Sequence, residues 1–129
     1  MFTPEQLTES MPFAVAAGVA ITAASPEEVR ATLPFHADRC TLGGVLHGGA
    51  LITLADSAGA VCAFLNLPDG AKGTSTLETK TNLFRAARAD VEAISRPVHI
   101  GSSTIVVQTD LHADGKHISR TTQTQMVLR

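Results

Sequence analysis

The sequence predicts an α+β fold in which one long buried helix packs against an antiparallel sheet of five or six strands. Residues 47–66 form an apolar, Ala-rich run that is far longer than a typical strand. After Gly73 the chain is rich in Thr, Val and Ile, with period-two stretches that indicate strands. Two earlier segments, 19–24 and 28–35, are separated by Ser25-Pro26 and have the pattern of a hairpin.

Length and composition indicate one domain with a core of small and aliphatic residues. The chain has 129 residues, which we assign to a single domain over 1–129, and its 44% hydrophobic content is enough for a real core. Trp and Tyr are absent and there are five Phe, so Ala, Val, Leu and Ile must fill most of the core. A net charge of -2 and a pI near 6.2 give no electrostatic reason to expect nucleic acid or an anionic membrane as a partner.

The N-terminal segment contains a helix start followed by an apolar stretch. Thr3-Pro4-Glu5-Gln6 provides a Thr N-cap, a Pro at the first helical position and an acidic first turn, which predicts a short helix to about Ser10. Residues 11–21 resemble the apolar part of a signal peptide, but no Lys or Arg precedes Arg30. The stretch is also too short to span a bilayer, so we expect a cytoplasmic protein that does not enter the membrane.

The two cysteines point to the same setting. Cys40 falls in a predicted loop and Cys62 in the apolar helix, and neither has zinc-type spacing with a histidine. This placement argues against a disulfide-stapled secreted framework and favours a reduced environment. We expect neither a metal ion nor a cofactor.

The central and C-terminal elements follow in order. Residues 36–46 form a loop that ends in glycines, 47–66 form the helix, and Pro68-Asp69-Gly70 makes a turn. The expected strands are Thr74–Phe84, Asp90–Ile100, Thr104–Ala113 and His117–Leu128. Short connections with turn residues join them, which predicts an antiparallel meander. One sheet of this size covers only part of a helix that is apolar on every face, so we expect the rest to meet a second chain.

Asp56 is the first candidate for chemistry. It is the only carboxylate between Arg39 and Asp69, and a lone carboxylate on a buried helix is costly unless it is partnered or used. The helix opens with His47, and the backbone N–H groups of Gly48 and Gly49 at its N-terminus could hold a negatively charged oxygen.

His47 and Asp56 are separated by about 13 Å of helical rise and about half a turn, so they cannot reach one reacting atom within a single chain. They could do so across a two-fold axis that sets two such helices antiparallel. This arrangement predicts two shared sites per dimer.

Each of these features also has a purely structural interpretation. Glycines at a helix start are often only turn and packing residues, and a histidine there is more often a hydrogen-bonded structural residue than a base. A buried Asp can be a hydrogen-bond hub. Ser57 lacks the Gly-x-Ser-x-Gly surroundings of a nucleophile elbow, and Cys62 fits a small core residue. The other histidines have no ligand spacing, and we expect them at the surface.

His47-Gly48-Gly49, followed by Leu54-Ala55-Asp56-Ser57-Ala58, resembles the hotdog-fold acyl-CoA thioesterases. The resemblance is greatest to the branch with the phenylacetate-pathway and 4-hydroxybenzoyl-CoA thioesterases, and it spans nearly the whole chain. It implies a long central helix wrapped by the sheet, and a homodimer paired into a tetramer.

The resemblance also implies roles for individual residues. The Gly48 N–H would polarise the thioester carbonyl, His47 would shape the turn, and Asp56 would act as general base on water or as nucleophile. Ser75, with Thr76 as second choice, would help to place the water. Many members of this branch carry Asn six residues before the histidine, where this chain has Thr41, whose hydroxyl has a shorter reach and no amide.

The substrate implied by the resemblance is an acyl-CoA. We expect the acyl group near Phe64, Leu65 and Phe84. By sequence position, the cationic candidates for binding coenzyme A are Lys72, Arg85, Arg88 and Arg96. The predicted reaction is hydrolysis to a carboxylic acid and free CoA. A non-catalytic acyl-CoA-binding protein of the same fold is the alternative, and a hotdog dehydratase or hydratase is a third reading that the His-Gly-Gly to Asp56 spacing disfavours.

Overall fold

A computed structural model describes all residues of the chain, 1–129. Its elements in chain order are α1 (Pro4–Glu9), α2 (Pro12–Ala17), β1 (Ala20–Ala24), β2 (Val29–Leu33), the 3₁₀ turn η1 (Ala37–Arg39), α3 (Gly48–Phe64), β3 (Gly73–Leu83), β4 (Val91–Ile100), β5 (Thr104–Ala113) and β6 (Lys116–Leu128).

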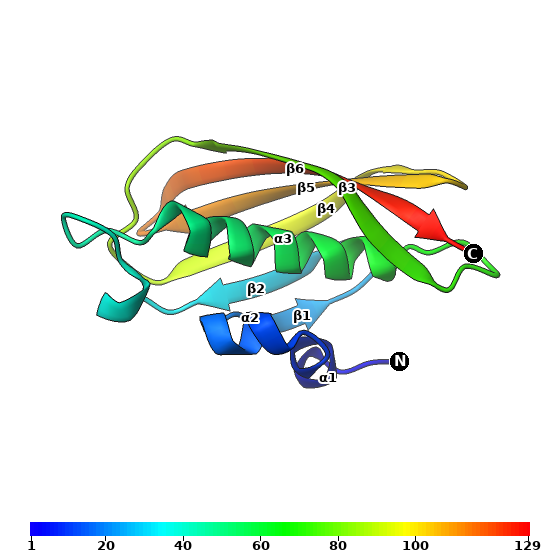
Figure 1. The fold of residues 1–129 in the computed structure, drawn as a ribbon, viewed down its shortest axis with the longest axis horizontal. Helices are drawn as coiled ribbons and strands as arrows, with labels where there is room; N and C mark the ends of the chain where they lie inside the picture. The colour runs from blue at the N-terminus through cyan, green and yellow to red at the C-terminus, as the bar shows by residue number, and fades with distance from the viewer.

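One antiparallel sheet and one long helix form the body of the molecule. The six strands lie in the order β1-β2-β4-β5-β6-β3, and α3 crosses one face of this sheet (Figure 1). The short helices α1 and α2 lie beside β1 and α3, on the same side of the sheet as α3 (Figure 1). The predicted α+β class, the single long helix and a sheet of six strands are therefore confirmed.

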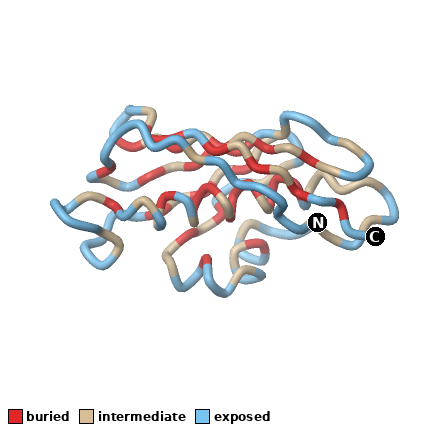
Figure 2. Tube along the Cα trace, turned by 45° about the horizontal axis from the view of Figure 1, so that its top comes forward, coloured by how far each residue is buried: buried red, intermediate tan, exposed pale blue.

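The core lies between α3 and the sheet. Buried positions recur along α3 and alternate along β2, the first half of β4 and β5 (Figure 2). In these stretches, alternate side chains therefore face the helix. Leu54 on α3 and Leu33, Ile105 and Leu111 on the sheet are fully buried. Ala, Val, Leu and Ile make up most of this cluster, as the composition predicts.

The predicted meander of four strands is wrong at its first strand. Strands β4, β5 and β6 form a meander, but β3 pairs with β6 rather than with β4 and so lies at the edge of the sheet. Tight turns join the meander strands, and one of them contains Asp114 and Gly115 at φ 51° and 70°. The longer link 84–90 instead lets the chain travel from the edge strand back to β4.

The N-terminal prediction is confirmed for α1 and incomplete after it. Thr3 caps α1 with a full capping box, and Pro4 occupies the first turn. The apolar stretch that resembles part of a signal peptide contains α2, which packs against α3 and has Gly18 as its C-cap, with φ 94°. Arg39 lies against Gly18 and donates hydrogen bonds to the Ala17 and Pro34 carbonyls, so it fastens the loop before α3 to the N-terminal segment.

Helix α3 is buried on most of its surface but not on all of it. His47 is the N-cap of α3, and the helix ends at Phe64, two residues before its predicted C-terminal end at residue 66. Apart from Gly48 and Ala50 in the first turn, the positions that retain exposure share one face of the helix, and we call this set the open stripe: Gly49, Ile52, Thr53, Asp56, Ala60 and Phe64. Ile52 and Phe64 are 38% and 37% exposed, which is high for large apolar side chains on a central helix.

No helix of the protein has both the length and the apolar character needed to cross a membrane. Both cysteines are free: Cys62 is buried in the core, as expected, and Cys40 is partly buried in the loop before α3.

Candidate active site

The start of α3 is organised by a histidine cap. His47 has extended backbone angles (φ -61°, ψ 135°), and its Nδ1 accepts a hydrogen bond of 2.8 Å from the Gly49 N–H. A Cβ atom on residue 49 would lie 2.9 Å from that Nδ1, so the cap geometry needs glycine at this position. Because Nδ1 is the acceptor, the neutral ring carries its proton on Nε2.

The His47 cap decides which N–H groups at the start of α3 are free to bind a substrate oxygen. The Gly49 N–H is not free to bind a substrate oxygen, since His47 already accepts it. The N–H groups of Ala50 and Leu51 both donate to the His47 carbonyl, so they are also occupied. The Gly48 N–H has no acceptor in the chain, and it is the one free donor of the first turn.

A pocket of about 330 Å³ opens beside Gly48. Phe84 and Arg85, two of the predicted substrate-binding residues, line this pocket together with Leu83. A Cβ atom on residue 48 would lie 3.2 Å from Leu83 Cδ1, so glycine also keeps the floor of the pocket open. The structure thus brings the predicted Gly48, Phe84 and Arg85 together.

Asp56 lies in the middle of the open stripe and is half-buried. Its Oδ1 accepts a hydrogen bond of 3.1 Å from Nε2 of Gln123 on β6, and it has no ion-pair partner. Burial raises the pKa of Asp56, and the Gln123 amide opposes that rise only in part. A carboxyl group with a raised pKa and an exposed side is suited to accept a proton or to attack a carbonyl carbon.

Gly48 and Asp56 are far apart within one chain. Eight residues of helix separate them by about 12 Å along the axis. The single subunit therefore does not bring the amide donor and the carboxylate to one reacting atom, as the spacing in the sequence implies.

The other predicted residues are distributed around these two centres. On β3, Thr76 pairs with the buried Gln125 and faces α3, whereas Ser75 pairs with the exposed Met126 and lies on the opposite face of the strand. Within the subunit, Thr76 is therefore the hydroxyl on the Asp56 side of the sheet. Thr41 is exposed in the loop before α3, where its N–H donates to the Val45 carbonyl.

The remaining cationic candidates differ in their surroundings. Arg88 is exposed and lines none of the pockets that contain Gly48, His47 or Phe64. Arg96 is paired with Glu28, which occupies its guanidinium group.

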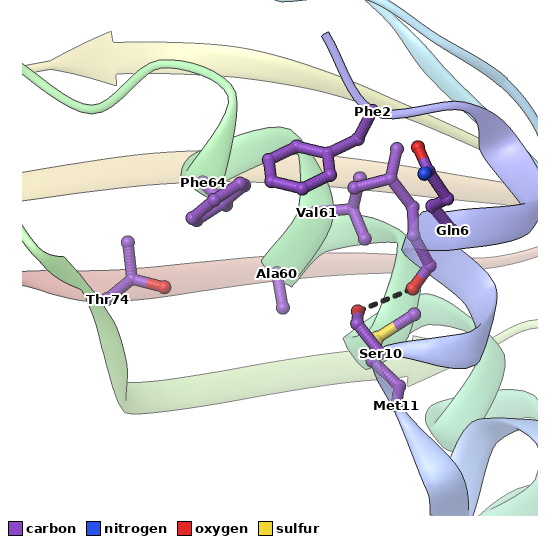
Figure 3. Close-up of a pocket in the computed structure, with 9 residues that line it drawn as sticks. Phe2, Gln6, Ser10, Met11, Ala60, Val61, Phe64 and Thr74 are labelled. Atoms are coloured by element: carbon purple, nitrogen blue, oxygen red, sulfur yellow. Dashed lines mark hydrogen bonds between the residues drawn. The ribbon is translucent and has the colours of Figure 1, made fainter.

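Two features next to Asp56 escape prediction from the sequence. Gln123 is fully buried under the helix, although a glutamine in a Thr-rich strand suggests a solvated position. A cavity of about 510 Å³ lies one turn beyond Asp56, between α3 and α1, and its lining includes Ala60, Val61 and Phe64 from α3 and Phe2, Gln6 and Met11 from the N-terminal segment (Figure 3). The period-two alternation of β6 could have indicated Gln123, but nothing local to the sequence indicates the cavity.

Comparison with known proteins places the chain in a family. Residues 43–119 match the family model described as the thioesterase superfamily. The chain belongs to the thioesterase superfamily. Among curated members, it is 34% identical over 86 residues to the 1,4-dihydroxy-2-naphthoyl-CoA hydrolase of Escherichia coli, an alignment that covers 66% of this chain and 62% of that protein. The chain spans about six tenths of the length of the first curated relatives it matches, 60–63%.

Solved structures of similar proteins have the same fold. A thioesterase from Haemophilus influenzae superposes with a TM-score of 0.92 at 27% identity, covering 100% of this chain and 92% of that one. A phenylacetic acid degradation protein from Thermus thermophilus superposes with a TM-score of 0.83 at 29% identity, covering 92% of this chain and 100% of that one. The six-stranded sheet around α3 is the hotdog fold, as the resemblance implies.

Proposed function

We propose that the protein is an acyl-CoA thioesterase that hydrolyses its substrate to a carboxylic acid and free CoA. Membership of the thioesterase superfamily supports this class of reaction, and so does the similarity to a naphthoyl-CoA hydrolase. The observation that carries the proposal is that one helix presents both a free backbone N–H, at Gly48, and a half-buried carboxyl group with a raised pKa, at Asp56. A thioester carbonyl is activated enough that these two groups can suffice.

The site is shared between two subunits in this proposal. Ile52 lies midway between Gly48 and Asp56 on α3, and it is the exposed aliphatic residue of the open stripe. Two antiparallel copies of α3 that cross a two-fold axis at Ile52 would set Gly48 of one subunit opposite Asp56 of its partner. The apolar contact would also cover the part of the stripe that the sheet leaves open.

The edge strand β3 supports the same dimer. It pairs only with β6, and its residues 75–80 are exposed on both faces. An edge strand with free N–H and C=O groups is suited to pair with another strand. Antiparallel pairing of two β3 strands would continue the sheet across the two-fold axis and place the two α3 helices side by side. Further pairing of dimers into a tetramer remains part of the proposal, and light scattering on the purified protein would measure it.

The chemistry follows from the two groups. The Gly48 N–H would donate to the carbonyl oxygen and hold the negative charge that develops on it, a contribution commonly worth about 3–4 kcal/mol in the barrier. Asp56 would either take a proton from water as the water attacks, or attack the carbonyl carbon itself to give an anhydride that water then cleaves. In both routes the thiolate of CoA leaves and is protonated. Thr76, on the α3 side of β3, would help to place the water, and His47 would hold the turn at Gly48.

The acyl group would occupy the cavity between α3 and α1. Ala60 and Phe64 line this cavity (Figure 3) and follow Asp56 at intervals of one turn on the same face of α3, so the cavity begins one turn from the carboxylate. Phe2 and Phe64 contact each other within its lining, with ring centroids 6.0 Å apart. At about 510 Å³ and with mostly apolar walls, it has room for an aromatic or medium-length aliphatic acyl group.

The coenzyme A part of the bound substrate would extend into the pocket beside Gly48. Phe84 and Arg85 line this pocket, so Arg85 is the cation we assign to a phosphate of CoA, and Arg88 near the end of the same loop is the second candidate. A cytoplasmic location fits this substrate and the two free cysteines.

A hydrolysis screen tests the proposed class. Aryl, short-chain and long-chain acyl-CoAs are incubated with the protein, and the free thiol is detected. We expect turnover of at least one, abolished in Asp56→Ala and retained in Asp69→Ala, which removes an exposed carboxylate in the turn after the helix. Binding of acyl-CoA without release of thiol from any of them would favour the non-catalytic alternative.

Mixed dimers test the shared site. Gly48 is the first residue of α3 and His47 already has extended angles, so Gly48→Pro removes the N–H in a conformation that proline accepts. Gly48→Ala is the matched control, since it adds a Cβ beside Leu83 but keeps the N–H. Equal mixing of Gly48→Pro and Asp56→Ala chains, each inactive alone, should restore about a quarter of wild-type activity, because half of the dimers are mixed and each has one complete site. Folded mixed dimers without activity would contradict the shared site.

A further inference from the structure

The inward face of β6 is polar where a strand beneath a helix is expected to be apolar. Its buried residues that face α3 and β3 are Ser119, Thr121, Gln123 and Gln125, followed by Val127. Buried polar side chains are retained where they have partners. Thr121 hydrogen-bonds Thr81 on β3 over 2.7 Å, and Gln125 donates to Thr76 over 2.7 Å. Gln123 is different, because its partner lies on the helix.

The Gln123 amide contacts one residue of α3 at two points. Its Nε2 donates to Asp56 Oδ1 over 3.1 Å and approaches the Asp56 main-chain carbonyl oxygen at 3.5 Å. A group that bonds both the side chain and the backbone of one residue fixes the side chain relative to the helix. With Oδ1 occupied by the amide, Oδ2 is left for the exposed side of the stripe. Gln123 is the only side chain that hydrogen-bonds this carboxylate.

A glycine in the helix makes room for the amide. Gly59 is buried near the middle of α3, where glycine weakens a helix relative to alanine. A Cβ atom on residue 59 would lie 1.8 Å from Gln123 Oε1 and 2.9 Å from its Cδ. The Gln123 side chain therefore reaches Asp56 only because residue 59 has no side chain.

The orientation of the amide follows from its surroundings. Gln123 Oε1 is buried without a donor, which is unfavourable, and an apolar side chain of similar length would avoid this. The reversed amide would place Oε1 against the Asp56 oxygens and would leave the NH₂ group without the carboxylate. The observed orientation is therefore the one that gives the ionised carboxylate a donor.

No other charge controls Asp56 within the subunit. The side chains that face α3 from the sheet are neutral along β2, β4 and β5, and on β6 and β3 they are hydroxyls, amides and aliphatic groups. The other titratable group on α3 is Cys62, and burial raises the pKa of its thiol to about 11, so it is neutral near pH 7.

We propose that Gln123 is a positioning residue for Asp56: through the space left by Gly59, its amide aims the carboxylate toward the substrate and stabilises the ionised form. The inference rests on the proposed function for the role of Asp56 in turnover. The contact itself does not depend on turnover and can be tested separately.

The first test is the pH profile of kcat/KM for the thioester that gives the best turnover. Gln123→Met keeps the length of the side chain and removes the donor. The acidic limb of the profile should then move up by about one to two pH units, as expected for a lost hydrogen bond to a charged group. At neutral pH, kcat should fall about tenfold or more while KM changes little. Gly59→Ala, with Gln123 intact, should shift the limb in the same direction because the added methyl displaces the amide.

The matched control is Thr121→Val. It removes a buried hydrogen bond from the same face of the same strand, two residues away, without touching Asp56. Its pH profile should superimpose on that of the wild type. If the Gln123→Met profile also superimposes on the wild type, or if Thr121→Val shifts the limb equally, the positioning role is refuted.

A second measurement separates this inference from the proposed function. The carboxyl ¹³C chemical shift of Asp56 is followed by NMR from pH 3 to 8 in the wild type and the variants, with no substrate present. The midpoint should rise in Gln123→Met even if no thioester is hydrolysed, and an unchanged midpoint overturns the proposal. Should Gln123→Met not fold, the double variant Gly59→Ala/Gln123→Leu fills the vacated space with a methyl group and should give the same shift.

Discussion

Replacing Asp56 by Asn should stabilise the protein while it abolishes hydrolysis. The Asp56 carboxylate is half-buried, has no cation beside it and has one neutral donor, Gln123. Burial therefore raises its pKa, because the charged form loses hydration that the single amide does not replace. Asn keeps the shape and an oxygen acceptor for Gln123 but carries no charge. The variant should be more stable wherever the wild-type residue is ionised.

The magnitude follows from the exposure of the residue and the size of the chain. Single substitutions that relieve an unfavourable interaction commonly contribute about 0.5–2 kcal/mol, and a half-exposed carboxylate falls at the lower end, about 0.5–1 kcal/mol. For 129 residues the entropy of unfolding is about 0.3 kcal/mol/K, so the variant should melt about 2–4 °C higher at pH 7–8. Thermal unfolding by circular dichroism, at one fixed protein concentration from pH 4 to 8, measures the difference.

The pH dependence has a definite sign. Because the pKa of Asp56 is higher in the native state than the ordinary value of 3.8, the native protein holds this proton more tightly than the unfolded chain does. The resulting stability is present below the ordinary value and is lost as the pH rises through the native-state pKa. The gap between Asp56→Asn and wild type should thus be small at pH 4 and grow toward neutral pH. A variant that melts lower at pH 7–8, or a gap that shrinks with rising pH, would refute the reasoning.

Three further outcomes are expected. Asp110→Asn should show the opposite pH dependence. Burial acts to raise the pKa of Asp110, but hydrogen bonds from Arg120 and His117 outweigh this effect and lower the pKa. The variant should therefore be less stable than wild type by under about 1 kcal/mol at neutral pH, and the difference should disappear as the pH falls below 3.8. Leu54→Ala, at a fully buried position of α3, should cost about 3 kcal/mol, visible as a lower urea midpoint. Gly18→Ala should cost at least about 1 kcal/mol in the same assay, because φ is 94° and the new methyl would overlap the Arg39 guanidinium; an unchanged midpoint in either variant would contradict the packing described.

Much of the fold is accessible from the sequence because local signals agree with the final structure. The capping box at Thr3 and the apolar run after His47 set helix starts that the structure confirms. The position of β3 was not accessible. Its polar and apolar residues alternate too weakly to say which strand it joins, and the choice of β6 over β4 depends on how the link 84–90 runs across the end of the sheet. Helix α2 was missed because an apolar, Ala-rich stretch is compatible with several roles.

Some residues of the candidate site can likewise be predicted from the sequence, whereas others can be found only in the structure. The glycines after His47 and the lone Asp56 could be singled out, since their residue types and spacing are unusual for a buried helix. That the Gly49 N–H is already used by His47 could not be deduced, because it depends on the rotamer of one ring. The partnership of Gln123 with Asp56 joins residues far apart in the sequence and is set by the packing of α3 on β6.

The fit between Gln123 and Gly59 also bears on how the chain folds. A helix displaced by one residue is turned by about 100°, and it would then present Ala58 or Ala60 to the glutamine instead of Gly59. A methyl group at that point would clash with the amide and would leave both of its ends buried without partners. A packing of α3 in a wrong register is thus destabilised at the Gln123 amide, the group that contacts Asp56 in the native packing. The contact that holds the Asp56 side chain therefore also helps to fix the register in which α3 packs on the sheet.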